Sequence, residues 1–203
     1  MAWNTEETRQ RLKQAAVEEF AAYGLHGTTM ERIAQCAGIN KERLYNYFGN
    51  KECLFAMVLS DELAKVAAAV PFDLVRAEDI GEFAGRVFDY HAENPYLVRL
   101  LHWEALAYGD GNVPDEAERM VYYRQKVDAF SAAQRAGILT DQSDAACLVF
   151  LVLALAGWWF AVPQVARMLT APEGSSANER AHQRAAVVHA ARCLTLPTPI
   201  PTE

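Results

Sequence analysis

Clustered cysteines are the first feature that the sequence lacks. Its four cysteines form no CxxC pair and show no ligand-like spacing to the five histidines (Cys36, Cys53, Cys147 and Cys193). A disulfide framework or a structural zinc site needs such clustering. We therefore expect no metal site, no cofactor, and a protein of the reducing cytoplasm.

Catalytic signatures and long apolar segments are equally scarce. The sequence has no GxSxG, HExxH, P-loop or dinucleotide fingerprint, and its polar, acidic N-terminus is not a signal peptide. Residues 145–162 form one stretch of eighteen residues without a charge, which is the lower limit for a membrane-spanning helix. Because Ala and Gly make up a third of it and no basic cluster precedes it, we expect burial in protein and no membrane partner.

The net charge of −7 is unevenly distributed along the chain. Residues 1–55 carry equal numbers of basic and acidic side chains, so the excess negative charge lies in residues 56–203. A negative chain argues at first against a nucleic-acid partner. A neutral N-terminal part and an acidic remainder nevertheless fit a protein of two parts better than a uniformly acidic enzyme.

The apolar residues follow a helical period from end to end, without convincing strand alternation. Start and stop signals predict an all-α fold of about nine helices, the first of which ends at Gly24. A capping box at Thr28 opens the second. The remaining helices are expected over residues 28–37, 41–48, 51–70, 78–93, 95–108, 114–136, 143–168 and 176–194.

Residues 28–48 (TTMERIAQCAGINKERLYNYF) have the pattern of a helix-turn-helix. Gly38 supplies the positive φ that such a turn requires, and Leu44 and Phe48 share one face of the second helix. The other face and its flanks carry Glu42, Arg43, Tyr45, Asn46 and Tyr47. Arg and Asn bind base edges and Tyr hydroxyls suit phosphates, so this helix is expected in the DNA major groove.

Spacing alone leaves a second interpretation open for this helix. Any short polar helix can place two tyrosines beside its apolar side, and Glu42 and Glu52 would repel phosphate. Lys51 favours DNA binding, because its ammonium and the free N–H groups at the start of the next helix can meet one phosphate.

Three sequence patterns decide between these interpretations: F-x-x-x-G-x-x-x-T-T-x-x-x-I-A at 20–34, A-G-I at 37–39, and L-Y-x-Y-F-x-x-K-x-x-L at 44–54. With them, the run from Thr5 to Leu59 resembles the DNA-binding region of tetracycline-repressor (TetR) family regulators. In that family, the positions of Thr29, Lys41, Tyr45, Tyr47 and Lys51 commonly contact phosphates or bases. Glu42 departs from the small residue often found there. The expected DNA-binding residues are Thr28, Thr29, Lys41, Arg43, Tyr45, Asn46, Tyr47 and Lys51.

The resemblance also implies an architecture and a function. We expect an N-terminal three-helix helix-turn-helix domain (residues 1–55) joined to a C-terminal helical bundle for dimerisation and effector binding (residues 56–203). The protein would be a homodimeric repressor that binds a palindromic operator in double-stranded DNA. A small apolar or amphipathic effector would release it, and no catalytic site is expected.

Sequence is less informative about the bundle. An effector pocket needs apolar walls with a few polar anchors, and the candidates for it are Trp103, Tyr90, Glu104, Tyr123 and Trp159. Asp89, Glu93 and Glu104 would give it an acidic bias and favour a cationic ligand.

The helices over 145–162 and 176–194 are expected to form a four-helix dimer interface. The candidates for it are Leu155, Ala181, Ala185, Val188 and His189. His182 and His189 are interpreted as interfacial polar residues rather than metal ligands, because neither has a carboxylate or cysteine ligand at local spacing.

Two other classes of protein remain as alternatives. An enzyme could use His91, His102 and Glu104 as an acid–base cluster, and a membrane-associated protein could use residues 145–162. Neither alternative explains the pattern at residues 28–48.

Overall fold

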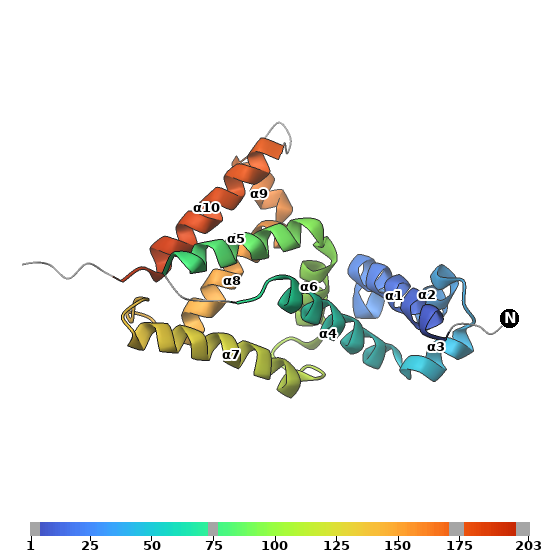
Figure 1. Cartoon of the computed structure of the whole chain (residues 1–203). Helices are drawn as coiled ribbons and strands as arrows, with labels where there is room; N and C mark the ends of the chain where they lie inside the picture. The colour runs from blue at the N-terminus through green and yellow to red at the C-terminus, as the bar shows by residue number, and fades with distance from the viewer. Residues whose placement is uncertain (1–4, 73–76, 171–176, 198–203) are drawn as a thin grey trace, which may run out of the picture. The chain divides into compact units, whose positions relative to one another are not determined.

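The structure, a computed structural model, describes residues 5–72, 77–170 and 177–197, and every regular element in these ranges is an α-helix (Figure 1). The helices are α1 (Thr5–Gly27), α2 (Met30–Ala37), α3 (Lys41–Phe48), α4 (Lys51–Ala69), α5 (Ala77–Glu93), α6 (Pro95–Tyr108), α7 (Glu116–Arg135), α8 (Ala145–Ala161), α9 (Pro163–Thr170) and α10 (Ala177–Thr195). The predicted all-α fold is confirmed, with ten helices in the described ranges where about nine were expected.

The additional helix arises where the sequence predicted one helix over residues 143–168. Val162, with φ −129° and ψ 61°, ends α8, and Pro163 begins α9. Proline suits the first helical position because the missing N–H would have no intrahelical partner there. The two helices are bent by 86° at this break. None of the described helices is by itself long and apolar enough to span a membrane. The bent pair of α8 and α9 taken together has sufficient length and apolar composition.

Packing divides the described chain into two compact units. The first contains α1, α2, α3, α4 as far as Lys65, and α6; the second contains the end of α4 together with α5 and α7 to α10. By packing, α6 therefore joins the N-terminal helices, whereas the sequence-based division placed it in the effector and dimerisation domain. A division of function at residue 55 stays a prediction, since packing does not test it.

An apolar core holds the first unit together. Leu12, Ile33 and Leu44, from α1, α2 and α3, are completely buried. The rings of Phe20 and Phe55, from α1 and α4, meet edge to face, with centroids 5.1 Å apart and an interplanar angle of 89°. Such edge-to-face contact is favoured by the charge distribution of aromatic rings. The short helices α2 and α3 are thus anchored on the two longer ones.

Helix α6 packs against α1 in the same unit. Arg99 Nε and Trp103 Nε1, both on α6, donate hydrogen bonds to the Ala21 carbonyl at 2.7 and 3.2 Å. That carbonyl is left available because α1 is interrupted at Gly24, where φ is 71° and ψ is −179°. The sequence predicted a helix end at Gly24; the chain breaks its helical geometry there and continues in α1 to Gly27.

The second unit is built around α5, α8 and α10, with Phe130 of α7 in its core. Figure 1 shows α10 running along α5. A Cβ on Gly81 would lie 2.6 Å from Arg192 Nε, and one on Gly85 would lie 2.9 Å from Val188 Cγ2. The two glycines of α5 therefore allow an approach of α10 that larger residues would prevent.

Candidate nucleic-acid interface

Hydrogen bonds close the turn between α2 and α3 at both ends. Gly38 ends α2 with φ 64° and ψ 34°, in the left-handed region that glycine adopts without strain. The Ile39 N–H donates to Ala34 O at 3.0 Å. Asn40 caps α3, since its Oδ1 accepts a hydrogen bond from the Glu42 N–H at 2.9 Å. The predicted helix-turn-helix is confirmed.

Helix α3 has a buried side and an exposed polar side. Leu44 and Phe48 are 0% and 4% exposed, whereas Tyr45 is 44% exposed. Tyr47 is half-buried beside Phe48, with ring centroids 6.0 Å apart. The other exposed side chains of α3 are Lys41, Glu42, Arg43 and Asn46. The face predicted from the helical period is therefore the face that the fold exposes.

The two threonines before α2 have different roles. Thr29 is exposed and caps α2, because its hydroxyl oxygen accepts a hydrogen bond from the Arg32 N–H at 3.2 Å. Thr28 is 1% exposed, and its hydroxyl donates to Glu19 Oε2 at 2.7 Å. The predicted capping box at Thr28 is thus wrong by one residue. The Thr28 hydroxyl is therefore used inside the fold, and a contact of this residue with DNA stays a prediction.

Glu19 of α1 is a buried residue beside the helix-turn-helix whose role the sequence did not reveal. Its carboxylate is 7% exposed and accepts hydrogen bonds from Thr28 and from the Cys36 thiol, the latter at 3.4 Å. It also forms an ion pair with Arg32 at 2.9 Å. One buried carboxylate therefore holds α2, and the residues just before it, against α1. Only a contact map could have revealed it, because its partners lie nine to seventeen residues away.

Two lysines flank the exposed face of α3. Lys41 pairs with Glu31, and this hydrogen bond raises the pKa of the Lys41 ammonium above its usual value despite some desolvation. The Lys41 ammonium also lies 5.9 Å from the centre of the Tyr45 ring. Lys51 is half-buried and donates to the Thr28 carbonyl at 3.1 Å. Lys51 thus holds the chain at the start of α2, with two further N–H donors on the same ammonium.

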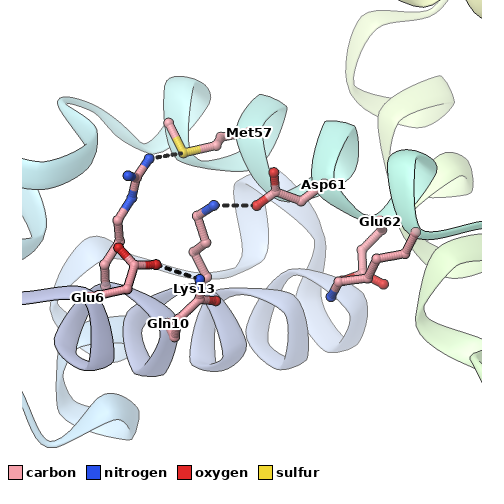
Figure 2. Close-up of polar contacts among 8 residues, drawn as sticks. Glu6, Gln10, Lys13, Met57, Asp61 and Glu62 are labelled. Carbon is pink, nitrogen blue, oxygen red and sulfur yellow. Dashed lines mark hydrogen bonds and ion pairs between the residues drawn. The ribbon is translucent and has the colours of Figure 1, made fainter. Parts of the chain in front are cut away.

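Helix α1 braces both the turn and α4. The Arg11 guanidinium donates to the Ala37 carbonyl, at the end of α2, at 2.7 Å. Figure 2 shows the ion pair between Lys13 of α1 and Asp61 of α4, with 2.5 Å between nitrogen and oxygen. The orientation of the helix-turn-helix is therefore fixed by side chains of α1 as well as by the apolar core.

The five candidate pocket residues lie in different environments. Trp103 and Glu104 belong to the first unit, where Trp103 packs on α1 and Glu104 is 7% exposed. Tyr90 and Trp159 are partly buried against the core of the second unit. Tyr123 is 40% exposed on α7. Of the five, only Tyr90 and Trp159 pack against one shared core.

His91 of α5 is a buried polar residue that the pocket prediction did not include. It is 8% exposed, and no described group forms a hydrogen bond to its Nδ1. Phe160 lies 6.0 Å from it between ring centroids, and burial lowers the pKa of the imidazole to about 4. His102 and Glu104, the other members of the alternative acid–base cluster, belong to the first unit.

The candidate dimer residues are also split by burial. Ala181, Ala185 and His189 are exposed along α10. Val188 is 7% exposed and packs on α5 of its own chain, and Leu155 is half-buried against the same core. Val188 therefore packs within its own protomer, and its contact with a second one stays a prediction.

A capped two-helix unit with an exposed polar second helix defines the class of the protein, a helix-turn-helix DNA-binding protein. Two family profiles match the sequence, "Bacterial regulatory proteins, tetR family" over residues 12–58 and "Tetracyclin repressor-like, C-terminal domain" over residues 79–193. The chain belongs to the TetR family. It is a DNA-binding transcriptional regulator and not an enzyme.

Relatives of known sequence or structure agree with this assignment. The chain is 44% identical over 168 residues to the HTH-type transcriptional repressor SCO4008 of Streptomyces coelicolor, covering 83% of this chain and 86% of the relative. The crystal structure of the transcriptional regulator SCO4942 from the same species has a TM-score of 0.78 and 32% identity, covering 93% of this chain and 98% of that one. FadR of Bacillus subtilis, solved with stearoyl-CoA, shares the fold with a TM-score of 0.67 and 14% identity over 92% of this chain and 98% of that one.

Proposed function

We propose that this regulator is a homodimeric repressor that binds a palindromic operator in double-stranded DNA and is released by a small effector. The two-sided helix α3 carries the proposal. Leu44 and Phe48 anchor it, while Arg43, Tyr45 and Asn46 are exposed. A helix of this composition, next to a capped turn, suits the major groove. The S. coelicolor relative is named a repressor, which favours repression over activation.

The residues of this face divide between bases and phosphates. Arg43 and Asn46 have the side chains that pair with guanine and adenine edges, and Tyr45 lies beside them on the exposed side. Contacts with phosphates are assigned to Thr29, Lys41, Tyr47 and Lys51. Thr29 and Lys51 stand at the starts of α2 and α4, whose free backbone N–H groups would bind the same phosphates. Thr28 instead positions α2 from inside the fold.

A second copy of the chain is proposed to cover the exposed faces of α8 and α10. Phe150, Leu151 and Trp158 of α8 are 72%, 42% and 61% exposed. Exposed apolar side chains gathered on one helix mark an interaction surface. Helix α10 packs beside α8 and exposes Ala181 and Ala185, whose small side chains permit close helix approach. Two such helices from each protomer would form a four-helix interface.

The effector is proposed to bind in the second unit, near His91. The neutral imidazole offers an unpaired Nδ1 among aromatic side chains, with Tyr90 and Phe160 at ring-centroid distances of 6.3 and 6.0 Å. That environment suits an apolar or amphipathic molecule with one hydrogen-bonding group. Asp89, one of the carboxylates expected to favour a cation, is paired with Arg184 at 2.7 Å and is not available for that purpose.

Release of DNA would follow from linkage. An effector that binds better to a dimer with mis-spaced recognition helices must weaken DNA binding by the same factor. Helix α4 is one of the covalent links between the units, because its residues up to Lys65 belong to the first unit and its last residues to the second, and we propose that it carries the shift. Since chromosomal DNA is the target, we place the protein in the cytoplasm, associated with the nucleoid when bound.

The test is binding of the full-length protein to DNA from around its own gene, at several salt concentrations. We expect tight binding to a palindromic site, with log K falling by about 0.9 per phosphate neutralised for each unit of log salt. Tyr45→Ala and Asn46→Ala should each weaken specific binding, by about 1–3 kcal/mol for the Asn–base pair.

The matched control is Tyr122→Ala, which removes a tyrosine that is 52% exposed on α7. This variant should bind the operator like the wild type. A folded dimer without sequence-specific binding would contradict the proposal, provided that extraction and refolding had removed any bound effector. Equal losses in Tyr45→Ala and Tyr122→Ala would show that α3 is not the recognition helix.

A further inference from the structure

A histidine and a cysteine lie together on the exposed side of α10. Cys193 follows His189 by four residues, and the Nε2 of His189 lies 3.5 Å from the Sγ of Cys193. Residues four apart lie on one face of a helix, the arrangement that also brings the two histidines of HExxH onto one zinc ion. This spacing corrects the expectation that no cysteine stands at a ligand-like distance from a histidine.

The distance between the two atoms fits a shared tetrahedral metal ion. Zinc binds imidazole nitrogen at about 2.0–2.1 Å and thiolate sulfur at about 2.3 Å, so tetrahedral ligands of these kinds lie about 3.6 Å apart. The observed distance of 3.5 Å between Sγ and Nε2 is therefore compatible with one shared ion. A direct thiol–imidazole hydrogen bond has the same length, and zinc would displace its proton.

The pair supplies only half of a zinc site. Structural zinc sites have four protein ligands, and in the described part of the chain no three His, Cys, Asp or Glu side chains are grouped for a metal. Both residues are exposed, on the same stripe of α10 as His182 and Ala185. This stripe belongs to the face proposed above for contact with a second copy.

We propose that His189 and Cys193 form half of a Zn²⁺ site, which the same pair of a second protomer completes across the dimer axis. A two-fold axis turns one imidazole and one thiolate into the two-cysteine, two-histidine set that zinc prefers. Thiolate and imidazole together select zinc over the hard cations Mg²⁺ and Ca²⁺. The site rests on the proposed homodimer, and zinc that binds only the dimer strengthens it.

Cobalt titration of the reduced, metal-free, untagged full-length protein tests the site. Co²⁺ replaces zinc in tetrahedral sites and reports thiolate ligands through a near-ultraviolet charge-transfer band and intense visible bands. We expect saturation at one Co²⁺ per two chains and displacement by Zn²⁺. Cys193→Ser should abolish the charge-transfer band. Because losing a residue that merely orients a ligand costs about 10- to 100-fold in metal affinity, His189→Gln should weaken binding by about 100-fold or more.

Two variants serve as matched controls. Cys53→Ser removes another exposed thiol, from α4, and His26→Gln removes another exposed imidazole, from α1, both outside the proposed dimer face. Both should bind Co²⁺ like the wild type. Bands that survive Cys193→Ser, weak octahedral bands, or absence of binding would overturn the site. One Co²⁺ per chain would overturn its sharing between protomers.

Operator binding and mass in solution, measured on the same samples, separate this inference from the proposed function. Cobalt bands at one ion per two chains without operator binding would leave the zinc site standing and contradict the repressor. A protein that remains monomeric with Co²⁺ present would overturn the shared site. Operator binding by a dimer without cobalt bands would contradict the zinc site alone.

Discussion

The indole ring of Trp103 occupies the space where any residue other than glycine at position 24 would place its Cβ. A Cβ built on Gly24 would lie 2.6 Å from both Cδ2 and Cε3 of Trp103. Gly24 also has a φ of 71°, which residues with a Cβ adopt only at a cost. The break in α1 and the packing of α6 against it therefore both depend on a single glycine.

Gly24→Ala should destabilise the first unit more than its backbone conformation alone requires. The backbone at φ 71° and ψ −179° costs about 1–3 kcal/mol for alanine, and overpacking against the indole adds about 1–3 kcal/mol. Gly24→Ala in a Trp103→Ala background is the matched control, because it keeps the backbone at position 24 and removes the indole that the Cβ would meet. Thermal and urea unfolding should show the larger loss for Gly24→Ala in the wild-type background. Equal losses would mean that Trp103 yields without cost.

Features set by local sequence were predictable. The turn at Gly38 and the cap at Asn40 follow from the preferences of glycine and asparagine for those backbone positions. The buried positions of Leu44 and Phe48 follow from the helical period. For the same reason, the polar face of α3 could be listed residue by residue before any contact was known.

Features set by contacts between distant residues were not predictable from spacing. Whether Thr28 or Thr29 caps α2 depends on Glu19, which is buried close enough to take the Thr28 hydroxyl. Trp103 was assigned to a pocket, but its indole N–H binds Ala21, eighty-two residues earlier. In the sequence, a titratable or aromatic residue looks the same whether its side chain lines a binding site or supports a neighbouring helix.

Glu19→Gln should loosen α2 from α1. The carboxylate accepts a hydrogen bond from Thr28 and pairs with Arg32. Glutamine in its place has no charge, and its NH₂ group would face one of these two donors, with which it cannot form a hydrogen bond. We expect a loss of about 1–3 kcal/mol in the free energy of unfolding, because the buried Thr28 hydroxyl loses a charged acceptor, whereas Arg32 is exposed and water can solvate it. Operator affinity should fall with it, as the start of α2 shifts.

Glu18→Gln is the control for Glu19→Gln. Glu18 is exposed and its carboxylate accepts only a surface hydrogen bond from Gln14, at 2.9 Å, among the contacts of the described residues. This change should stay within about 0.5 kcal/mol of the wild type. Urea unfolding of both variants at neutral pH would decide the matter, and similar stabilities would contradict the role assigned to Glu19.

His91 should make the protein less stable in mild acid. Its pKa in the folded chain is about 4, below the value of about 6.5 in an unfolded chain, so the unfolded chain binds the proton more readily. Stability should therefore be unaffected by His91 above about pH 6.5 and fall by up to about 3 kcal/mol as the pH drops to about 4. Urea midpoints measured at intervals between these values would follow the loss.

His91→Leu removes this titration together with the unpaired Nδ1. At pH 8 it should be as stable as the wild type or more so, because a buried polar atom without a partner is replaced by an apolar group. Its stability should fall less steeply than that of the wild type between about pH 6.5 and 4. His182→Gln, which removes an exposed imidazole, is the control. A steep acid loss that persists in His91→Leu would assign it to other groups.

Lys41→Gln should weaken operator binding chiefly by removing one phosphate contact. The Lys41 ammonium is exposed at the start of α3 and pairs with Glu31, a partner that phosphate can replace. Loss of one neutralised phosphate should lower the slope of log K against log salt by about 0.9, with similar effects on all DNA sequences. Lys65→Gln is the matched control, because Lys65 is equally cationic and exposed but pairs with Glu62 on α4. Titrations of both variants at three or more salt concentrations separate the two outcomes, since a change in affinity without a change in slope would place Lys41 away from the phosphates.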